Sequence, residues 1–302
     1  MTREGLQIDV VGLTKMFGTV KAVDDLSFHV DPGVVTGFLG PNGAGKTTTM
    51  RCLLGLVAPT AGTATLGGQN YRDLPDPIGT VGAALEASSF HPGRSARAHL
   101  EVMALGAGLD PARPEAVLVQ VGLTEVAGRR VGGFSLGMRQ RLGLAAALLG
   151  DPRVLILDEP ANGLDPAGIV WLRSFLRSLA AEGRTVLVSS HVLSEVQQTV
   201  EDVVVLSRGR LIKQGKLADL DAGPRGVLIR TPEPEKLRDA LASTVMSTEG
   251  EDEDGRVRVV GGTPAEVGHA AFIHGVELHE LTAEAGRLEK AFLEMTEGAQ
   301  TP

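Results

Sequence analysis

The sequence has a single cysteine, Cys52, in 302 residues. One cysteine excludes an internal disulfide framework and fits the reducing conditions of the cytosol. Long hydrophobic runs are also missing, because the longest, near LGLAAALLG (142–150), is far shorter than the roughly 20 apolar residues of a membrane-spanning helix. The first residues, MTREGLQIDV, lack the apolar core of a secretion signal. We therefore expect a soluble, cytoplasmic protein that would act at a membrane only through another chain.

Runs of lysine and arginine are missing as well. The net charge is −8, and it is uneven: residues 1–222 carry 21 Lys and Arg against 22 Asp and Glu, and residues 223–302 carry 8 against 15. No stretch has the basic run that follows a phosphate backbone. We therefore expect no nucleic-acid partner.

The patterns of apolar residues predict an α/β fold. Short apolar runs that read as strands alternate with stretches of helical pattern. Strand-like runs lie within 7–40 and at 153–160 and 185–190, and helical patterns lie at 47–57, 96–130, 137–150 and 167–183. Apolar strands that alternate with helices are typical of a largely parallel sheet covered on both faces.

The composition changes near Gly223 and Pro224, where we place a linker between a domain at 1–222 and a domain at 225–302. The second domain is predicted to be a small α+β unit with three strands and three helices. The strands are expected at 226–231, 255–261 and 275–281, and the helices at 233–243, 263–272 and 285–296. We interpret the acidic run EGEDEDG (249–255) as a solvated turn and not as a metal site, because nothing fixes its geometry. We interpret His269, His274 and His279 as surface or core residues.

The string GPNGAGKT (40–47) follows an apolar strand and opens a helix, which is the setting of a phosphate-binding loop. Its glycines let successive amide groups and the helix dipole face an anion. Lys46 supplies a positive charge for the β- and γ-phosphates, and Thr47 offers a hydroxyl to Mg²⁺. The sequence thus predicts binding of ATP with Mg²⁺, with Asn42, Gly43, Gly45 and Thr48 around the phosphates.

Two acids end the hydrophobic strand VLILDEP (154–160). Ligands of open α/β sheets bind beyond the carboxyl ends of the strands, where the phosphate loop also lies. Asp158 is therefore expected to hold Mg²⁺, and Glu159 to accept a proton from the attacking water. The alternative is that these acids only cap the turn before Pro160.

The loop and helix GGFSLGMRQRLGLAAALL (132–149) add a second anion site, formed by Ser135 and Gly137 at a helix N-terminus expected at Met138 or Arg139. With these motifs the chain resembles the ATP-binding subunit of an ABC transporter. The resemblance implies a P-loop cassette with a RecA-like core, an antiparallel β subdomain and a helical subdomain. It also implies a dimer, expected to be a homodimer, in which FSLGM of one cassette closes on the γ-phosphate held by the other.

The resemblance assigns roles to further residues over 7–215. Phe17 matches the aromatic that stacks on adenine, although it could be an ordinary core residue. Asp165 in NGLDP matches the loop that crosses the dimer interface. His191 matches the histidine that contacts the γ-phosphate, with a structural histidine as the alternative. Lys46, Glu159 and His191 are then the expected catalytic residues.

Glu86 lies 40 residues after Lys46, where the family has a glutamine that touches Mg²⁺ and begins the loop to the membrane subunit. We therefore include it among the metal residues. The helical segment 96–130 would dock a helix of a membrane-spanning subunit, which is a separate chain at the inner face of the cell membrane. Glu86, SLGM and the added domain resemble bacterial exporters of peptide antibiotics, lantibiotics and other drugs.

Two alternatives stay open. One is an importer with a regulatory C-terminal domain. The other is a soluble ABC ATPase that acts on ribosomes or DNA, which the single cassette, the acidic charge and the lack of a heptad arm disfavour.

Overall fold

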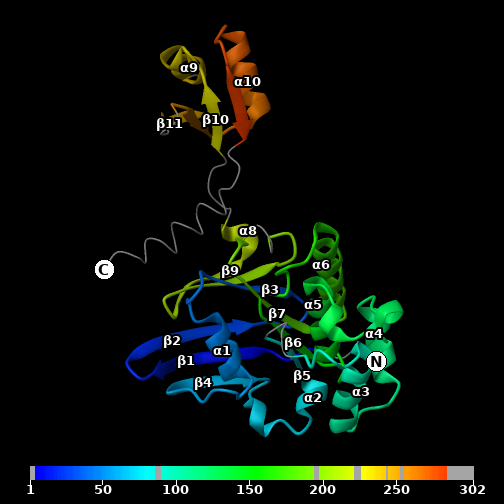
Figure 1. Ribbon diagram of the computed structural model, residues 1–302. Coiled ribbons are helices and arrows are strands. Elements are labelled where there is room, and N and C mark those ends of the chain that lie inside the picture. Colours follow the sequence, from blue (N-terminus) through cyan, green and yellow to red (C-terminus); the bar gives the residue numbers. More distant parts are fainter. Residues whose placement is uncertain are drawn as a thin grey trace. The chain divides into compact units, whose positions relative to one another are not determined.

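The chain forms two compact units in the computed structural model, which describes residues 4–85, 90–193, 197–220, 226–242, 244–251 and 255–283. The larger unit reaches Leu217 and the smaller begins at Ala218 (Figure 1). The linker expected at Gly223 and Pro224 lies outside the described residues. None of the helices in the described ranges combines the length and the apolar character that a membrane crossing requires.

The larger unit is built on a six-stranded sheet in the order β5-β6-β7-β3-β8-β9. The first five strands of this order run parallel, and β9 pairs antiparallel with β8. All four residues of β6 are buried, which explains its unbroken apolar run. The strands are β3 (Val35–Leu39), β5 (Val81–Ala84), β6 (Val154–Leu157), β7 (Thr185–Ser190), β8 (Asp202–Ser207) and β9 (Arg210–Lys216). The predicted, largely parallel sheet is confirmed.

A second sheet of three antiparallel strands has the order β2-β1-β4. Its strands are β1 (Ile8–Phe17), β2 (Val20–Val30) and β4 (Ala61–Leu66). Helix α1 (Lys46–Leu53) contacts β2 and β4, and one hydrophobic core joins both sheets to it. In this core Phe28 of β2 meets Phe38 of β3 with ring centroids 5.1 Å apart, beside the fully buried Met50 of α1.

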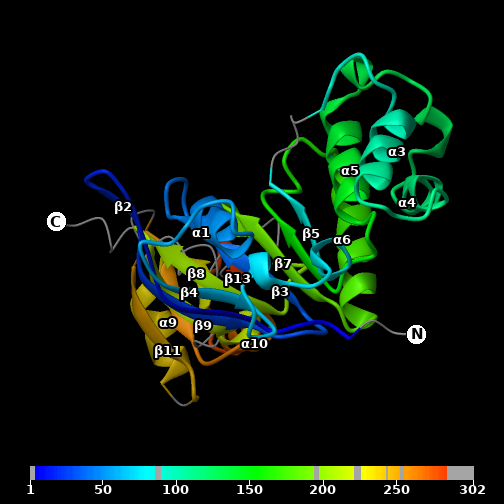
Figure 2. The same cartoon turned by 90° about the horizontal axis from the view of Figure 1, so that it is seen from below.

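A group of helices forms the third part of the larger unit (Figure 2). Helices α3 (Ala96–Gly106), α4 (Arg113–Gln120) and α5 (Leu136–Ala147) pack against one another, and α5 also contacts β5. Helix α6 (Pro166–Ala181) packs on β7 and β3, while α2 (Pro77–Thr80) and α8 (Leu217–Leu220) are single turns. Core, antiparallel subdomain and helical subdomain are thus the three parts expected of the cassette.

From Gly226 on, the described residues of the smaller unit form a four-stranded antiparallel sheet in the order β11-β12-β10-β13 and two helices. Its elements are β10 (Gly226–Arg230), α9 (Pro234–Leu241), β11 (Ser247–Glu251), β12 (Val257–Val260), α10 (Pro264–Ile273) and β13 (Glu280–Ala283). This βαββαβ order is that of ferredoxin-like folds. Val227, Ile229 and Val259 pack with Leu237 and Val267 of the helices in a core of their own.

The interpretation of 249–255 as a solvated turn is wrong for its first residues, because β11 extends to Glu251. Strand β11 pairs with β12, and the Glu249 carboxylate forms an ion pair with Arg258 of that neighbour. An edge strand with exposed side chains does not need alternating apolar and polar residues, so the sequence pattern of β11 does not predict a strand. The strand expected at 275–281 begins only at Glu280, and the helix expected at 285–296 lies outside the described residues.

Candidate functional site

The loop GPNGAGKT connects the carboxyl end of β3 to the start of α1. Gly43 and Gly45 have φ angles of 82° and 101°, which side-chain-bearing residues rarely adopt. A Cβ at Gly45 would lie 2.6 Å from the carbonyl oxygen of Ala22. Asn42 and Gly43 are exposed and Thr48 is half-buried. The loop therefore turns tightly and leaves the helix N-terminus, with its positive dipole end, available to an anion.

Lys46 is the buried cation of this loop, with 6% of its surface exposed. Its Nζ donates hydrogen bonds to the carbonyl oxygens of Gly40 at 2.6 Å and Pro41 at 3.3 Å. The Oε1 of Glu159 lies 3.5 Å away and forms an ion pair with it. The ammonium group is thus held at the loop, next to a carboxylate from the other predicted motif.

Asp158 lies just beyond the end of β6, and its hydrogen bonds connect this end to the neighbouring strands β5 and β7. Its backbone N–H donates to the carbonyl of Ala84 at the end of β5, at 2.9 Å. The hydroxyl of Thr47 donates to Oδ2 at 2.5 Å, and the hydroxyl of Ser189 on β7 donates to Oδ1. Both carboxylate oxygens therefore have fixed partners.

Glu159 combines an unusual backbone conformation with two polar neighbours, the side chains of Lys46 and His191. Its φ of 51° lies in the left-handed region, which costs a non-glycine residue on the order of 1 kcal/mol. Its N–H donates to Oγ of Ser189 at 2.9 Å, and its Oε2 lies 2.9 Å from Nδ1 of His191. Such strain at a polar site is typical of functional residues. The structure thus brings Lys46, Thr47, Asp158, Glu159 and His191 together.

The oxygen atoms of Thr47 and Asp158 fit a magnesium ion. Mg²⁺ prefers oxygen ligands and is commonly held by one or two carboxylates together with substrate phosphates, not by a full protein cage. The described part of the chain has no group of three or more His, Cys, Asp or Glu side chains that could hold a metal. Glu86, the third expected metal residue, lies outside the described residues, although β5, which precedes it, ends beside Asp158.

Phe17 ends β1 with 51% of its surface exposed, so it is not a core residue. Nζ of Lys15 lies 4.9 Å from the centre of its ring. An exposed aromatic face beside a cation is available for stacking on a flat ligand.

The residues expected to reach a second cassette form another group. Ser135 is the N-cap of α5, and its Oγ accepts a hydrogen bond from the N–H of Met138. Helix α5 begins at Leu136, earlier than the sequence predicted. Asp165 likewise caps α6 by accepting from the N–H of Gly168 at 2.8 Å.

The two loops touch each other. A Cβ at Gly137 would lie 3.3 Å from Leu164, and Nε2 of Gln140 donates to the carbonyl of Asn162 at 3.1 Å. Ser135 and Asp165 are both exposed. The loop that ends at Ser135, which we call the signature loop, and the loop before α6 therefore form one surface region of the cassette.

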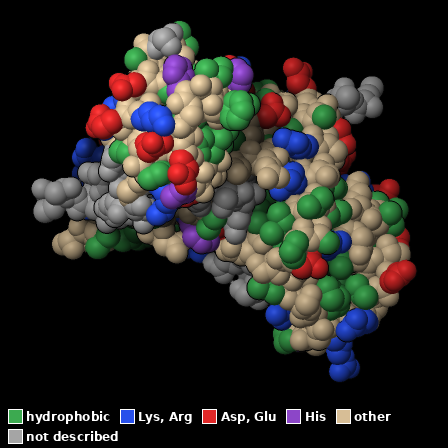
Figure 3. All heavy atoms as spheres, turned by 90° about the horizontal axis from the view of Figure 1, so that it is seen from above, with side chains coloured by type: hydrophobic (Ala, Val, Ile, Leu, Met, Phe, Trp, Pro, Cys, Tyr) green, Lys and Arg blue, Asp and Glu red, His purple; other side chains and the backbone are tan. Residues whose placement is uncertain are grey.

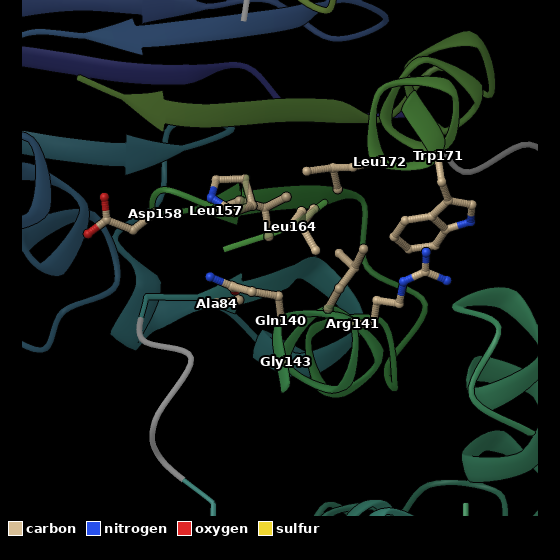
Figure 4. A pocket seen from close by; sticks show the side chains of 11 residues that line it. Ala84, Gln140, Arg141, Gly143, Leu157, Asp158, Leu164, Trp171 and Leu172 are labelled. Atoms are coloured by element: carbon tan, nitrogen blue, oxygen red, sulfur yellow. The ribbon is translucent and has the colours of Figure 1, made fainter. Parts of the chain in front are cut away.

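A pocket extends behind this region, between α5 and α6 (Figure 4). Asp158 lies at one end of it, and Trp171 of α6 and Arg141 of α5 lie at the other. The Arg141 guanidinium carbon is 4.2 Å from the centre of the Trp171 ring. This contact connects the helix of the signature loop to the helix that packs on the central sheet.

An open groove of about 500 Å³ runs between the end of α1, β5 and helices α3 and α5. Leu54, Leu56, Phe90 and Met103 give it apolar walls, and Leu56 and Met103 are exposed. His99 also lines it, with a pKa lowered by burial and by the nearby Arg94. On the face shown in Figure 3, hydrophobic side chains lie among charged side chains of both signs.

Comparisons with known proteins bear on this site. A family profile described as ABC transporter matches residues 23–162. The bacitracin transport ATP-binding protein BcrA of Bacillus licheniformis is 37% identical over 303 residues, which cover 96% of this chain and 97% of the relative. The chain belongs to the ATP-binding proteins of ABC transporters. The cassette is therefore an ATPase that powers a transporter, and its partner is a membrane-spanning subunit.

Further matches are also ATP-binding proteins of transporters. The Nod factor export ATP-binding protein I of Paraburkholderia xenovorans is 38% identical over 306 residues, covering 98% of both chains. A solved structure of an ATP-binding subunit of an ABC transporter matches with a TM-score of 0.64 and 29% identity, covering 70% of this chain and 91% of that one. A second profile, described as a domain of unknown function, matches residues 225–289 of the cassette protein.

Ser189 was not among the residues expected at the cassette's site. Its one signal in the sequence is its place in the pair Ser189–Ser190 directly before His191. The register of β7 against β6, which the sequence does not reveal, brings its hydroxyl to both acids.

Proposed function

We propose that this cassette hydrolyses ATP with Glu159 as the general base. The observation that carries the proposal is the Glu159 carboxylate, held between the Lys46 ammonium and the His191 imidazole. In this position it can accept a proton from a water that attacks the γ-phosphate. Lys46 and the loop amides hold the phosphates, and His191 orients the base and the γ-phosphate.

Mg²⁺ is proposed to bind at Thr47 and Asp158, where it would neutralise phosphate charge during the reaction. Ser189 keeps one Asp158 oxygen engaged, so the oxygen facing Thr47 is the one directed to the metal. Glu86 is proposed to approach the same metal. Phe17, exposed at the end of β1, is proposed to stack on the adenine.

Two copies of the chain are proposed to form the working dimer. Ser135 and Gly137 of one copy would contact the γ-phosphate in the other, and Asp165 would cross the interface. The exposure of Ser135 and Asp165 on one surface region supports this. Closure on ATP and reopening after hydrolysis would be the motion that drives transport, because only bound ATP favours the closed state.

The transporter is proposed to export an antibiotic peptide or a related drug from the cytoplasm. The support is the similarity to the bacitracin transport protein, which extends over both units of the chain. The chain would lie at the inner face of the membrane, with a helix of the membrane subunit docked along segment 96–130. The apolar groove beside α3 suits such a helix.

The test is reconstitution of the chain with a co-expressed membrane subunit in lipid vesicles. Bacitracin and a lantibiotic, added separately, are expected to raise ATP hydrolysis and to be moved in an ATP-dependent way. Lys46→Met is the control that should abolish both. Stimulation by neither peptide, in vesicles that still hydrolyse ATP, would refute the proposed class of substrate.

A further inference from the structure

Ser189 is a fully buried residue of β7 whose hydroxyl contacts both acids of the proposed mechanism. Its Oγ accepts a hydrogen bond from the N–H of Glu159 at 2.9 Å and donates one to Oδ1 of Asp158. We propose that Ser189 is a positioning residue for ATP hydrolysis, which fixes the orientation of the metal-binding acid and of the general base together. The proposal rests on the roles proposed above for Asp158 and Glu159.

The strand register places Ser189 at this point. Strand β6 ends at Leu157, which pairs with Val188 of β7. Strand β7 continues for two more residues because it also pairs with β3, where Phe38 lies opposite Ser189. Ser189 is therefore the β7 residue beside the first residues after β6. An apolar side chain here would leave a buried N–H and a carboxylate oxygen without this partner.

The single hydroxyl has a separate task toward each acid. As a donor it holds Oδ1 of Asp158, which leaves Oδ2 to face the Thr47 hydroxyl at 2.5 Å. As an acceptor it holds the N–H of Glu159, the residue with a φ of 51°. A left-handed conformation of a glutamate persists only where its surroundings support it. This bond therefore helps to direct the Glu159 carboxylate toward Lys46 and His191.

Loss of the hydroxyl is expected to reduce the rate of the chemical step more than the binding of ATP. Misplacement of a base or metal ligand by a fraction of an ångström to one ångström lowers kcat by about 10- to 100-fold. The KM for ATP should change less than about 3-fold, because the phosphate loop keeps all its own contacts. The Mg²⁺ concentration for half-maximal activity should rise, since Asp158 can then rotate.

The experiment measures kcat, the KM for ATP and the Mg²⁺ dependence of the full chain, with thermal unfolding to verify the fold. Ser189→Ala should show the large fall in kcat with little change in the KM for ATP. Ser189→Thr, which keeps the hydroxyl, should regain most of kcat. Thr185→Val is the matched control: Thr185 begins the same strand, is fully buried, and donates its hydroxyl to Leu6 at 2.6 Å, away from the acids. Should Ser189→Ala not fold, Ser189→Cys gives the same test, because a thiol hydrogen-bonds only weakly.

Three outcomes overturn the proposal: a parent-like kcat in folded Ser189→Ala, no regain of kcat in Ser189→Thr, or an equal loss in Thr185→Val. Glu159→Gln is measured in the same experiment, because it distinguishes a failure of the role proposed for Ser189 from a failure of the general-base assignment. If Glu159→Gln is inactive while Ser189→Ala matches the parent, only the role of Ser189 is wrong. If Glu159→Gln hydrolyses ATP like the parent, the general-base assignment itself is wrong.

Discussion

The contact between Arg141 and Trp171 connects α5 to α6 and contributes to the stability of the larger unit. The guanidinium carbon lies 4.2 Å from the indole centre, and Nη1 also donates to the carbonyl of Val121 at 3.3 Å. A partly buried cation–π contact stabilises by about 1 kcal/mol, and a long hydrogen bond to a backbone carbonyl adds about 0.5 kcal/mol. Arg141→Met keeps much of the apolar stem, so it should lower the free energy of unfolding by about 1.5 kcal/mol.

A double-mutant cycle isolates the stacking part. Trp171→Leu removes the ring, and the coupling energy with Arg141→Met should be about 1 kcal/mol, because the bond to Val121 is lost in either background. Urea unfolding followed by circular dichroism gives the free energies of unfolding of the parent, the two single variants and the double variant. In variants that keep it, the fluorescence of Trp171, the chain's one tryptophan, reports on the larger unit alone.

Arg177→Met is the control, since Arg177 is an exposed arginine of α6, the helix that carries Trp171. It should change stability by less than about 0.5 kcal/mol. The stack does not stabilise the packing of α5 on α6 if the coupling energy is near zero, or if Arg177→Met loses as much free energy of unfolding as Arg141→Met.

Three further predictions concern the core and the groove. Cys52 is 5% exposed and burial raises the pKa of its thiol, so iodoacetamide should label it far more slowly in the native chain than in urea; equal rates would contradict its burial in α1. The pKa of His99 is lowered below its ordinary 6.5 in the folded chain, so the unfolded chain binds more protons below pH 6.5 and stability should fall as the pH drops from 7.5 to 5.5. His99→Gln should weaken that pH dependence in urea unfolding, and an unchanged slope would show that other groups cause it. Leu56→Asp places a charge in the apolar groove, so it should reduce co-purification of the membrane subunit at least 10-fold without changing the chain's own ATP hydrolysis; undiminished co-purification would remove the groove from the docking surface.

Much of the cassette could be predicted from the sequence because its motifs act locally. The glycines of the phosphate loop, the helix after Lys46 and the apolar strands before Asp158 and His191 all depend on residues close in the chain. The predicted strand at 185–190 has the bounds that the structure gives. The α/β class and the parallel sheet followed from these local patterns.

The rest depends on pairing across the chain. Ser189 meets Asp158 and Glu159 only through the register of β7 against β6, which no local pattern encodes. Strand β11 carries an acidic sequence and exists because β12 offers it a free edge and Arg258. Helix α5 begins at Leu136 because the Ser135 hydroxyl caps it, whereas the sequence predicts a start at Met138 or Arg139.

The proposed role of Glu159 as the base of ATP hydrolysis can be tested by replacing its carboxylate with an amide. ATP turnover of the purified full chain is compared with that of Glu159→Gln, which nearly keeps the side-chain volume and leaves the Ser189 bond to the backbone in place. We expect kcat to fall by about 100-fold or more in Glu159→Gln, with ATP still bound and the chain trapped as a dimer. Parent-like turnover in Glu159→Gln would contradict it.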